Sequence, residues 1–211
     1  MAVTGLVMIA FLLMHMYGNL KMFQGPEAFV GYADWLKGEI AYPIFPEGGF
    51  IWAFRIFMLA SVVLHIWAAV SLSRQTLGVR GGGNQTTKRI AQTYSARTMR
   101  WGGVLIAGFI IFHLLQFTVR VLETGFDSTA DAYEMVILSF QTPWVFIFYA
   151  VLMVMVVMHV RHGFWSAFVT LGANTSARTQ KVFNWLGIAI AVILYVGFMI
   201  MPVGVLLGWI V

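Results

Sequence analysis

Four of the five histidines in this sequence lie inside long apolar stretches, and they are the residues best suited to chemistry: His15, His65, His113 and His159. An imidazole in the hydrocarbon layer of a membrane costs free energy unless something there binds it, so such histidines are candidates for function. Imidazole nitrogens are good ligands for iron and other transition metals. The four histidines therefore suggest metal binding, and the elements that carry them must show whether they can meet.

The composition indicates an integral membrane protein. The chain has 211 residues, of which 60% are hydrophobic and only 10% are charged, and its mean hydropathy is +0.84. A water-soluble domain of this length could not bury so much apolar surface, so we predict a single all-α membrane domain over residues 1–211. The chain has no cysteine, which excludes disulfides, thiolate metal sites and a c-type haem attached through CxxCH.

Five apolar stretches are long enough to cross a membrane core of about 30 Å at about 1.5 Å per residue. They predict a bundle of five transmembrane helices at 2–23, 50–73, 101–122, 142–171 and 183–211. The first stretch begins almost at Met1 without a basic leader, so we expect a retained helix and not a cleaved signal.

The connections between these stretches differ in charge. All acidic residues lie in the first and third connections: Glu27, Asp34, Glu39, Glu47, Glu123, Asp127, Asp131 and Glu134. The second and fourth connections hold bases without acids: Arg74, Arg80, Lys88, Arg89, Arg97, Arg100, Arg178 and Lys181. By the positive-inside rule, the N-terminus is predicted to be cytosolic and the C-terminus outside. The basic residues that raise the pI to about 9.7 are therefore explained by membrane topology, and we expect no nucleic-acid partner.

The first connection also contains the segment FVGYADWLKGEI. The spacing of its apolar residues predicts a short amphipathic helix on the membrane surface.

Depth in the membrane sorts the four histidines into two levels. Counted at 1.5 Å per residue from Lys21, Phe50, Arg120 and Pro143, taken as the outer ends of the helices, His15 and His113 lie about 9 and 10 Å deep, and His65 and His159 about 22 and 24 Å deep. Each level thus receives one imidazole from each of two helices, which is how a helical bundle places two ligands on one iron. The levels differ by roughly 13 Å, which suits two stacked macrocycles. We predict two b-type haems, with small residues leaving room for them at Gly18, Ala68, Ala69 and Gly163.

The sequence resembles the five-helix, dihaem cytochrome b membrane anchor of bacterial succinate:quinone oxidoreductases, which act as succinate dehydrogenase or fumarate reductase. Four motifs carry the resemblance over nearly the whole chain: HMYGNLKMFQGPEAFVGYADWL, LHIWAA, FHLLQF and HVRHGFWSAFVTLG. The most specific feature is a histidine followed four residues later by glycine and then aromatic residues. The resemblance implies that His15 and His113 ligate an outer haem, and that His65 and His159 ligate an inner haem.

The resemblance also implies a function in the respiratory chain and the tricarboxylic acid cycle, in the bacterial cell membrane. The chain would relay electrons between an iron–sulfur subunit and membrane quinone, expected to be menaquinone, while a flavoprotein subunit oxidises succinate. Both partner subunits would dock on the basic cytosolic connections, and this chain would have no activity alone. No residue can be matched to a quinone site.

Two further residues are candidates for cofactor binding. Arg120 lies seven residues after His113, where it could pair with a propionate of the outer haem or anchor the helix at the interface. His162 lies close to His159 but about 6 Å too deep to face His65; it is expected at the cytosolic boundary, near a propionate or a docked subunit.

Two other functions remain open. The histidines could form a relay in a proton or solute transporter, although no Asp or Glu lies within a span. The chain could also be an anchor that lacks haem or holds another iron centre.

Overall fold

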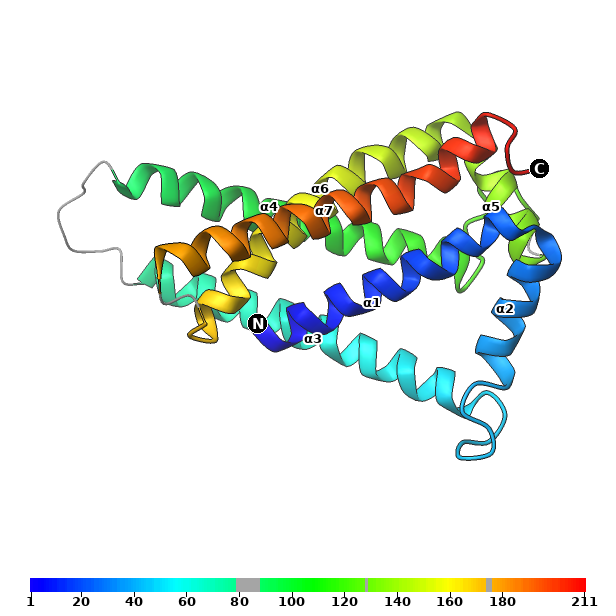
Figure 1. The fold of residues 1–211 in the computed structure, drawn as a ribbon, viewed down its shortest axis with the longest axis horizontal. Helices are drawn as coiled ribbons and strands as arrows, with labels where there is room; N and C mark the ends of the chain where they lie inside the picture. The colour runs from blue at the N-terminus through cyan, green and yellow to red at the C-terminus, as the bar shows by residue number, and fades with distance from the viewer. Residues whose placement is uncertain (79–87, 128, 174–175) are drawn as a thin grey trace.

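The computed structural model describes residues 1–78, 88–127, 129–173 and 176–211, which form helices and no strand (Figure 1). In chain order the elements are α1 (Ala2–Leu20), the 3-10 helix η1 (Lys21–Gln24), α2 (Pro26–Gly38), α3 (Gly49–Gly78), α4 (Lys88–Phe117), α5 (Ala132–Gln141), α6 (Pro143–Thr170) and α7 (Ala177–Leu206).

Among the described residues, five segments are long and apolar enough to cross a membrane: Ala2–Gln24, Gly49–Gln75, Met99–Phe117, Pro143–Thr170 and Ala177–Leu206. The predicted all-α fold with five membrane-spanning helices is therefore confirmed, and the chain is a multi-pass membrane protein. The predicted bounds are less accurate. The third span ends at Phe117 instead of residue 122, and the fifth covers Ala177–Leu206 instead of 183–211.

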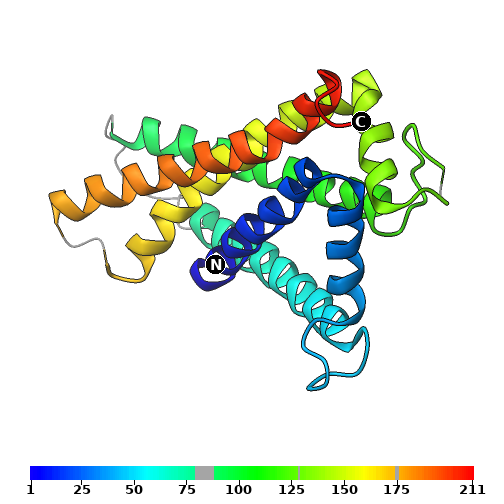
Figure 2. The same ribbon diagram turned by 45° about the vertical axis from the view of Figure 1, so that its right-hand side comes forward.

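The bundle is built around α6 and α7, which pack against each other along the molecule. Helix α1 packs against both of them, and α4 packs against α6. Helix α3 packs mainly on α1 and α2; Figure 2 shows these three helices as the sides of a triangle, with α3 diverging from the rest of the bundle. The four predicted ligands lie on four of these helices: His15 on α1, His65 on α3, His113 on α4 and His159 on α6.

The charged connections are separated along the bundle. The end of α3, the start of α4, the end of α6 and the start of α7 lie at one end, and α2, α5 and the C-terminus lie at the other (Figure 1). The described acidic residues thus lie at one end of the bundle, and the basic residues Arg100, Arg178 and Lys181 lie at the opposite end. Which end faces the cytosol stays a prediction.

Two apolar clusters hold the helices together. One lies toward α5 and includes the fully buried Val145, and the other lies along α1, α6 and α7 around the fully buried Leu194. Many large apolar side chains elsewhere are exposed; Trp67, for example, is 68% exposed. Such exposure suits contact with lipid, since hydrocarbon tails are as apolar as the side chains themselves.

The end of α4 corrects the prediction for Arg120. The helix stops at Phe117, where the N–H groups of Thr118 and Val119 both bond to the carbonyl of Leu114. Arg120 then has a positive φ of 63°, which an α-helix cannot contain. The expected position of Arg120, two helical turns beyond His113, is therefore wrong. The depth count for His113 also used Arg120 as the helix end, so this histidine lies nearer the end of its helix than predicted.

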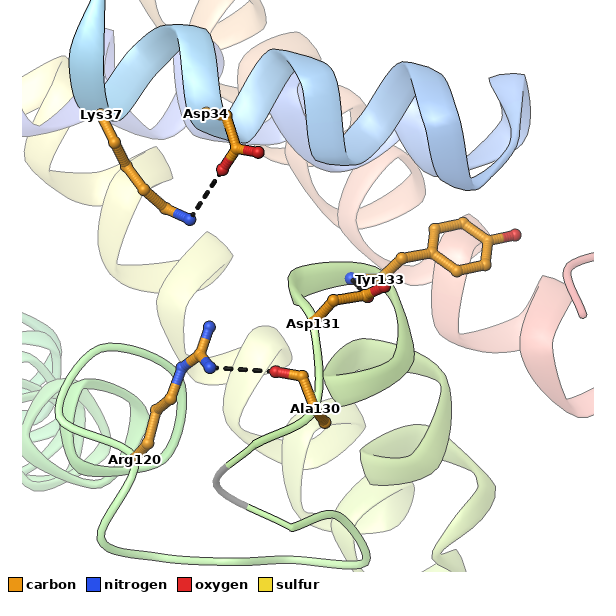
Figure 3. Close-up of polar contacts among 6 residues, drawn as sticks. All are labelled: Asp34, Lys37, Arg120, Ala130, Asp131 and Tyr133. Atoms are coloured by element: carbon orange, nitrogen blue, oxygen red, sulfur yellow. Dashed lines mark hydrogen bonds and ion pairs between the residues drawn. The ribbon is translucent and has the colours of Figure 1, made fainter.

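Two short helices lie at the acidic end of the bundle. The predicted amphipathic helix is present as α2, with Lys37 and Asp34 forming an exposed ion pair of 3.3 Å (Figure 3).

Helix α5 was not predicted. Asp131 caps it by accepting hydrogen bonds from the N–H groups of Tyr133 and Glu134 at 2.7 and 2.9 Å. The guanidinium of Arg120 donates to the carbonyl of Ala130 at 3.0 Å, so it connects the end of α4 to the start of α5 (Figure 3).

We predict that Asp131→Ala frays the first turn of α5. Losing an N-cap side chain costs about 1 kcal/mol, so the amide protons of α5 should exchange with solvent about fivefold faster. Hydrogen exchange followed by mass spectrometry measures this effect. Asp131→Asn is the matched control, because asparagine caps equally well; equal exchange in the alanine variant and the wild type would contradict the capping role.

Candidate functional site

The outer pair of histidines comes from α1 and α4. The ring centres of His15 and His113 lie 5.8 Å apart, and the ring planes are nearly perpendicular at 84°. Phe11 stacks on His15 with ring centres 5.4 Å apart, and Phe198 of α7 lies against the same ring. Phe109 and Phe117 of α4 and Tyr149 of α6 lie against His113, so aromatic side chains of four helices surround the two imidazoles.

The inner pair comes from α3 and α6. The ring centres of His65 and His159 lie 6.4 Å apart. The Nδ1 atom of His159 is buried without a hydrogen-bond partner. A buried polar atom without a hydrogen-bond partner costs free energy. Binding of a ligand, a water molecule or an ion to this atom would remove that cost.

The two pairs lie at different levels of the bundle. A Cβ built on Gly5 of α1 would lie 3.5 Å from His65, and one built on Gly103 of α4 would lie 3.8 Å from His159. From Gly5 to His15, and equally from Gly103 to His113, the chain advances ten residues, or about 15 Å along a helix. Two separate helices therefore give the same spacing between the levels, close to the predicted value of roughly 13 Å.

Hydroxyl groups contact one histidine of each pair. The Nδ1 atom of His65 lies 3.1 Å from the hydroxyl of Thr4, which donates to the carbonyl of Met1 at 3.0 Å. The Nδ1 atom of His113 lies 3.1 Å from the hydroxyl of Tyr149. In both pairs the hydroxyl belongs to a helix other than that of its histidine, so it fixes one imidazole relative to a neighbouring helix.

The contact of His113 continues into a buried polar network. Tyr149 donates to the amide oxygen of Gln116 at 2.7 Å. The amide nitrogen of Gln116 donates to Ser139 at 3.3 Å and also to Thr124. Gln116 and Ser139 are completely buried, and Tyr149 is 7% exposed.

Three residues predicted beside the haems have different surroundings. Gly18 faces α2, and a Cβ there would lie 3.2 Å from the ring of Tyr32. It therefore admits the ring of Tyr32 in this structure, and the expectation that Gly18 leaves room for a porphyrin stays a prediction. Gly163 has open space, with nothing within 4 Å of a Cβ built on it. His162 lies against Trp165, and the ring that faces His65 is that of His159.

The arrangement limits the metal centres that the described part of the chain can form. Nowhere in it do three or more His, Cys, Asp or Glu side chains gather as a metal site. Two imidazoles on opposite sides of one metal ion, with bonds of about 2 Å, have ring centres roughly 6 Å apart, as both pairs do. Such pairs fit haem, because its macrocycle supplies the remaining iron ligands.

Several residues of the site were not predicted: Thr4, Gly5, Gly103, Gln116 and Tyr149. Gln116 and Tyr149 carried a signal, because each is a polar residue within an otherwise apolar span. Gln116 also follows His113 by three residues, which places the two side chains on neighbouring parts of one helix face. Thr4, Gly5 and Gly103 become recognisable only when the helices are packed.

No family model, curated protein or solved structure matches this chain. The site must therefore be interpreted from its own residues and geometry.

We predict that each histidine pair can be bridged chemically. The chain has no cysteine, so the double variant His15→Cys/His113→Cys should be cross-linked by a short bifunctional thiol reagent, as should His65→Cys/His159→Cys. The matched control, His15→Cys/His159→Cys, joins the two levels about 15 Å apart and should stay open. Mass spectrometry of the intact chain reads the result, and cross-linking of the control alone would contradict the pairing.

Proposed function

We propose that this chain is the membrane anchor of a bacterial succinate:quinone oxidoreductase and that it holds two b-type haems. It would relay electrons between an iron–sulfur subunit and a membrane quinone. The observation that carries the proposal is the presence of two histidine pairs, each drawn from two helices, at two levels of the bundle. The four motifs that resemble the dihaem anchor family contain these same histidines.

The ligand roles follow from the pairs. His15 and His113 would hold the outer haem, and His65 and His159 the inner haem; when bound, each haem supplies a one-electron redox centre. The protein's part is to fix the imidazoles, exclude water with surrounding apolar and aromatic groups, and leave space at Gly163, where nothing lies within 4 Å of a built Cβ. A single chain with two such redox centres about 15 Å apart could pass electrons across the membrane without a conformational change.

The partner subunits would dock at the basic end of the bundle. Arg100, Arg178 and Lys181 lie there, and Arg161 bonds to Asn184 of α7 at 3.4 Å near the same end. Arg74 of the predicted docking connection is also described and is exposed, whereas Arg80 and the side chains of Lys88, Arg89 and Arg97 fall outside the described residues. His162 lies toward this end too, where it could meet a haem propionate or a partner subunit. Arg120 stays a candidate for an outer propionate, although its helical position has been corrected.

A proton or solute transporter explains the arrangement less well. A histidine relay needs titratable groups at successive depths through the bundle. Here the imidazoles gather in two pairs about 15 Å apart, and the sequence puts no Asp or Glu in any span between them.

We predict that the two pairs hold spectrally separate haems. His15→Ala and His113→Ala should each remove the same b-type component from the reduced-minus-oxidised spectrum, while His65→Ala and His159→Ala remove the other. Loss of different components in His15→Ala and His113→Ala would contradict the pairing. His162→Ala is the matched control for His159→Ala, and it should retain both components.

We also predict that the basic end faces the cytosol. In intact cells, a membrane-impermeant maleimide should modify Glu47→Cys, at the acidic end, but not Gln180→Cys, at the basic end. Both positions are exposed. Permeabilised cells serve as the control in which both variants react, and modification of Gln180→Cys alone in intact cells would reverse the topology.

A further inference from the structure

We infer that Gln116 and Tyr149 form a positioning device that holds the proton of His113 on Nδ1 and presents a bare Nε2 to the iron of the outer haem. The inference rests on the proposed function, because it assigns a role to residues that do not touch the iron. It concerns the hydrogen-bond network that joins α4, α5 and α6.

The network begins with an amide that needs several partners. Gln116 is completely buried, and a buried amide must satisfy both its oxygen and its nitrogen. Its nitrogen donates to the hydroxyls of Ser139 and Thr124. Its oxygen is therefore left to accept, and the group that it faces is the hydroxyl of Tyr149, 2.7 Å away.

The hydroxyl of Tyr149 has only one hydrogen. Because that hydrogen is donated to Gln116, the phenol oxygen can only accept from its other neighbour, the Nδ1 atom of His113 at 3.1 Å. Nδ1 must then carry the proton, and in a neutral imidazole Nε2 carries none. Only a bare nitrogen can bind a metal. Turning the amide of Gln116 around would reverse each bond and place the proton on Nε2, where it would block the iron.

In the inner pair, too, a hydroxyl group accepts from the Nδ1 atom of one histidine, but no side-chain amide stands behind that hydroxyl. Thr4 donates its hydrogen to the carbonyl of Met1, so its oxygen accepts from Nδ1 of His65. In each pair, then, one histidine has its proton directed away from Nε2 by a hydroxyl whose own hydrogen is committed elsewhere. The outer pair differs in having a side-chain amide behind the hydroxyl, which mutation can remove.

The hydrogen bond should also influence the electron affinity of the outer haem. Donation from Nδ1–H to an acceptor makes the imidazole a stronger electron donor to the metal. A stronger donor stabilises the ferric form, so the bond lowers the midpoint potential of the haem. Removing the acceptor should raise that potential.

A double-mutant cycle tests the inference in the purified protein. Redox titrations would compare wild type, Tyr149→Phe, Gln116→Leu and the double variant. We expect Tyr149→Phe to raise the midpoint potential of the outer haem and leave that of the inner haem unchanged. Gln116→Leu should shift the outer haem in the same direction by less. If Gln116 acts through Tyr149, the double variant will match Tyr149→Phe, whereas two independent structural effects would add.

Tyr195→Phe is the matched control, because it removes a hydroxyl from α7 that lies outside this network; it should change neither potential. An unchanged outer potential in Tyr149→Phe, or additive shifts in the double variant, would overturn the inference while leaving the haem proposal intact. Nitrogen NMR of the haem-free, histidine-labelled wild type gives a reading that needs no variant to fold: the proton of His113 should be on Nδ1, and a proton on Nε2 would overturn the inference. If the purified protein holds no haem, the proposed function fails, and the same NMR measurement on that protein decides the tautomer.

Discussion

The structure depends on the cost of placing polar imidazoles inside an apolar bundle. An unpartnered polar group in such surroundings loses its hydrogen bonds to water and gains nothing in return. His65 and His113 meet this cost through hydroxyls on neighbouring helices, whereas Nδ1 of His159 has no partner. One metal bound by each pair would compensate the two rings of that pair, because coordination replaces the lost interactions.

The helix packing follows from the same requirement. Pairs of imidazoles can share one iron only if their helices approach closely, and Gly5 and Gly103 are the residues of α1 and α4 that lie beside His65 and His159. Helix α3 packs mainly on α1 and α2 and leans away from the rest of the bundle. The inner haem would then tie α3 to α6 through its two ligands, adding a connection that direct helix packing provides only weakly.

The sequence allows much of this fold to be predicted, because apolar stretches of membrane length and the charge of their connections are local features. The grouping of His15 with His113, and of His65 with His159, follows from counting residues along straight helices. The end of α4 could not be found in this way, because Thr118–Leu122 contains apolar residues that would also suit the last turn of a helix. The backbone conformation that ends the helix, with a positive φ at Arg120, leaves no mark in the hydropathy of the sequence. Helix α5 carried a usable signal in Asp131 and Glu134, an N-cap followed by an acid three residues later. The contacts of Tyr149 and Thr4 depend on which helices become neighbours, and no local pattern in the sequence states that.

The most direct test is the haem content of the purified chain. Extraction into alkaline pyridine, together with a quantitative protein assay, gives the number and type of haems per chain. Two haems b per chain is the predicted result. A purified, folded chain that contains no haem b, even when produced in cells supplied with haem precursor, would contradict the assignment of the four histidines as ligands.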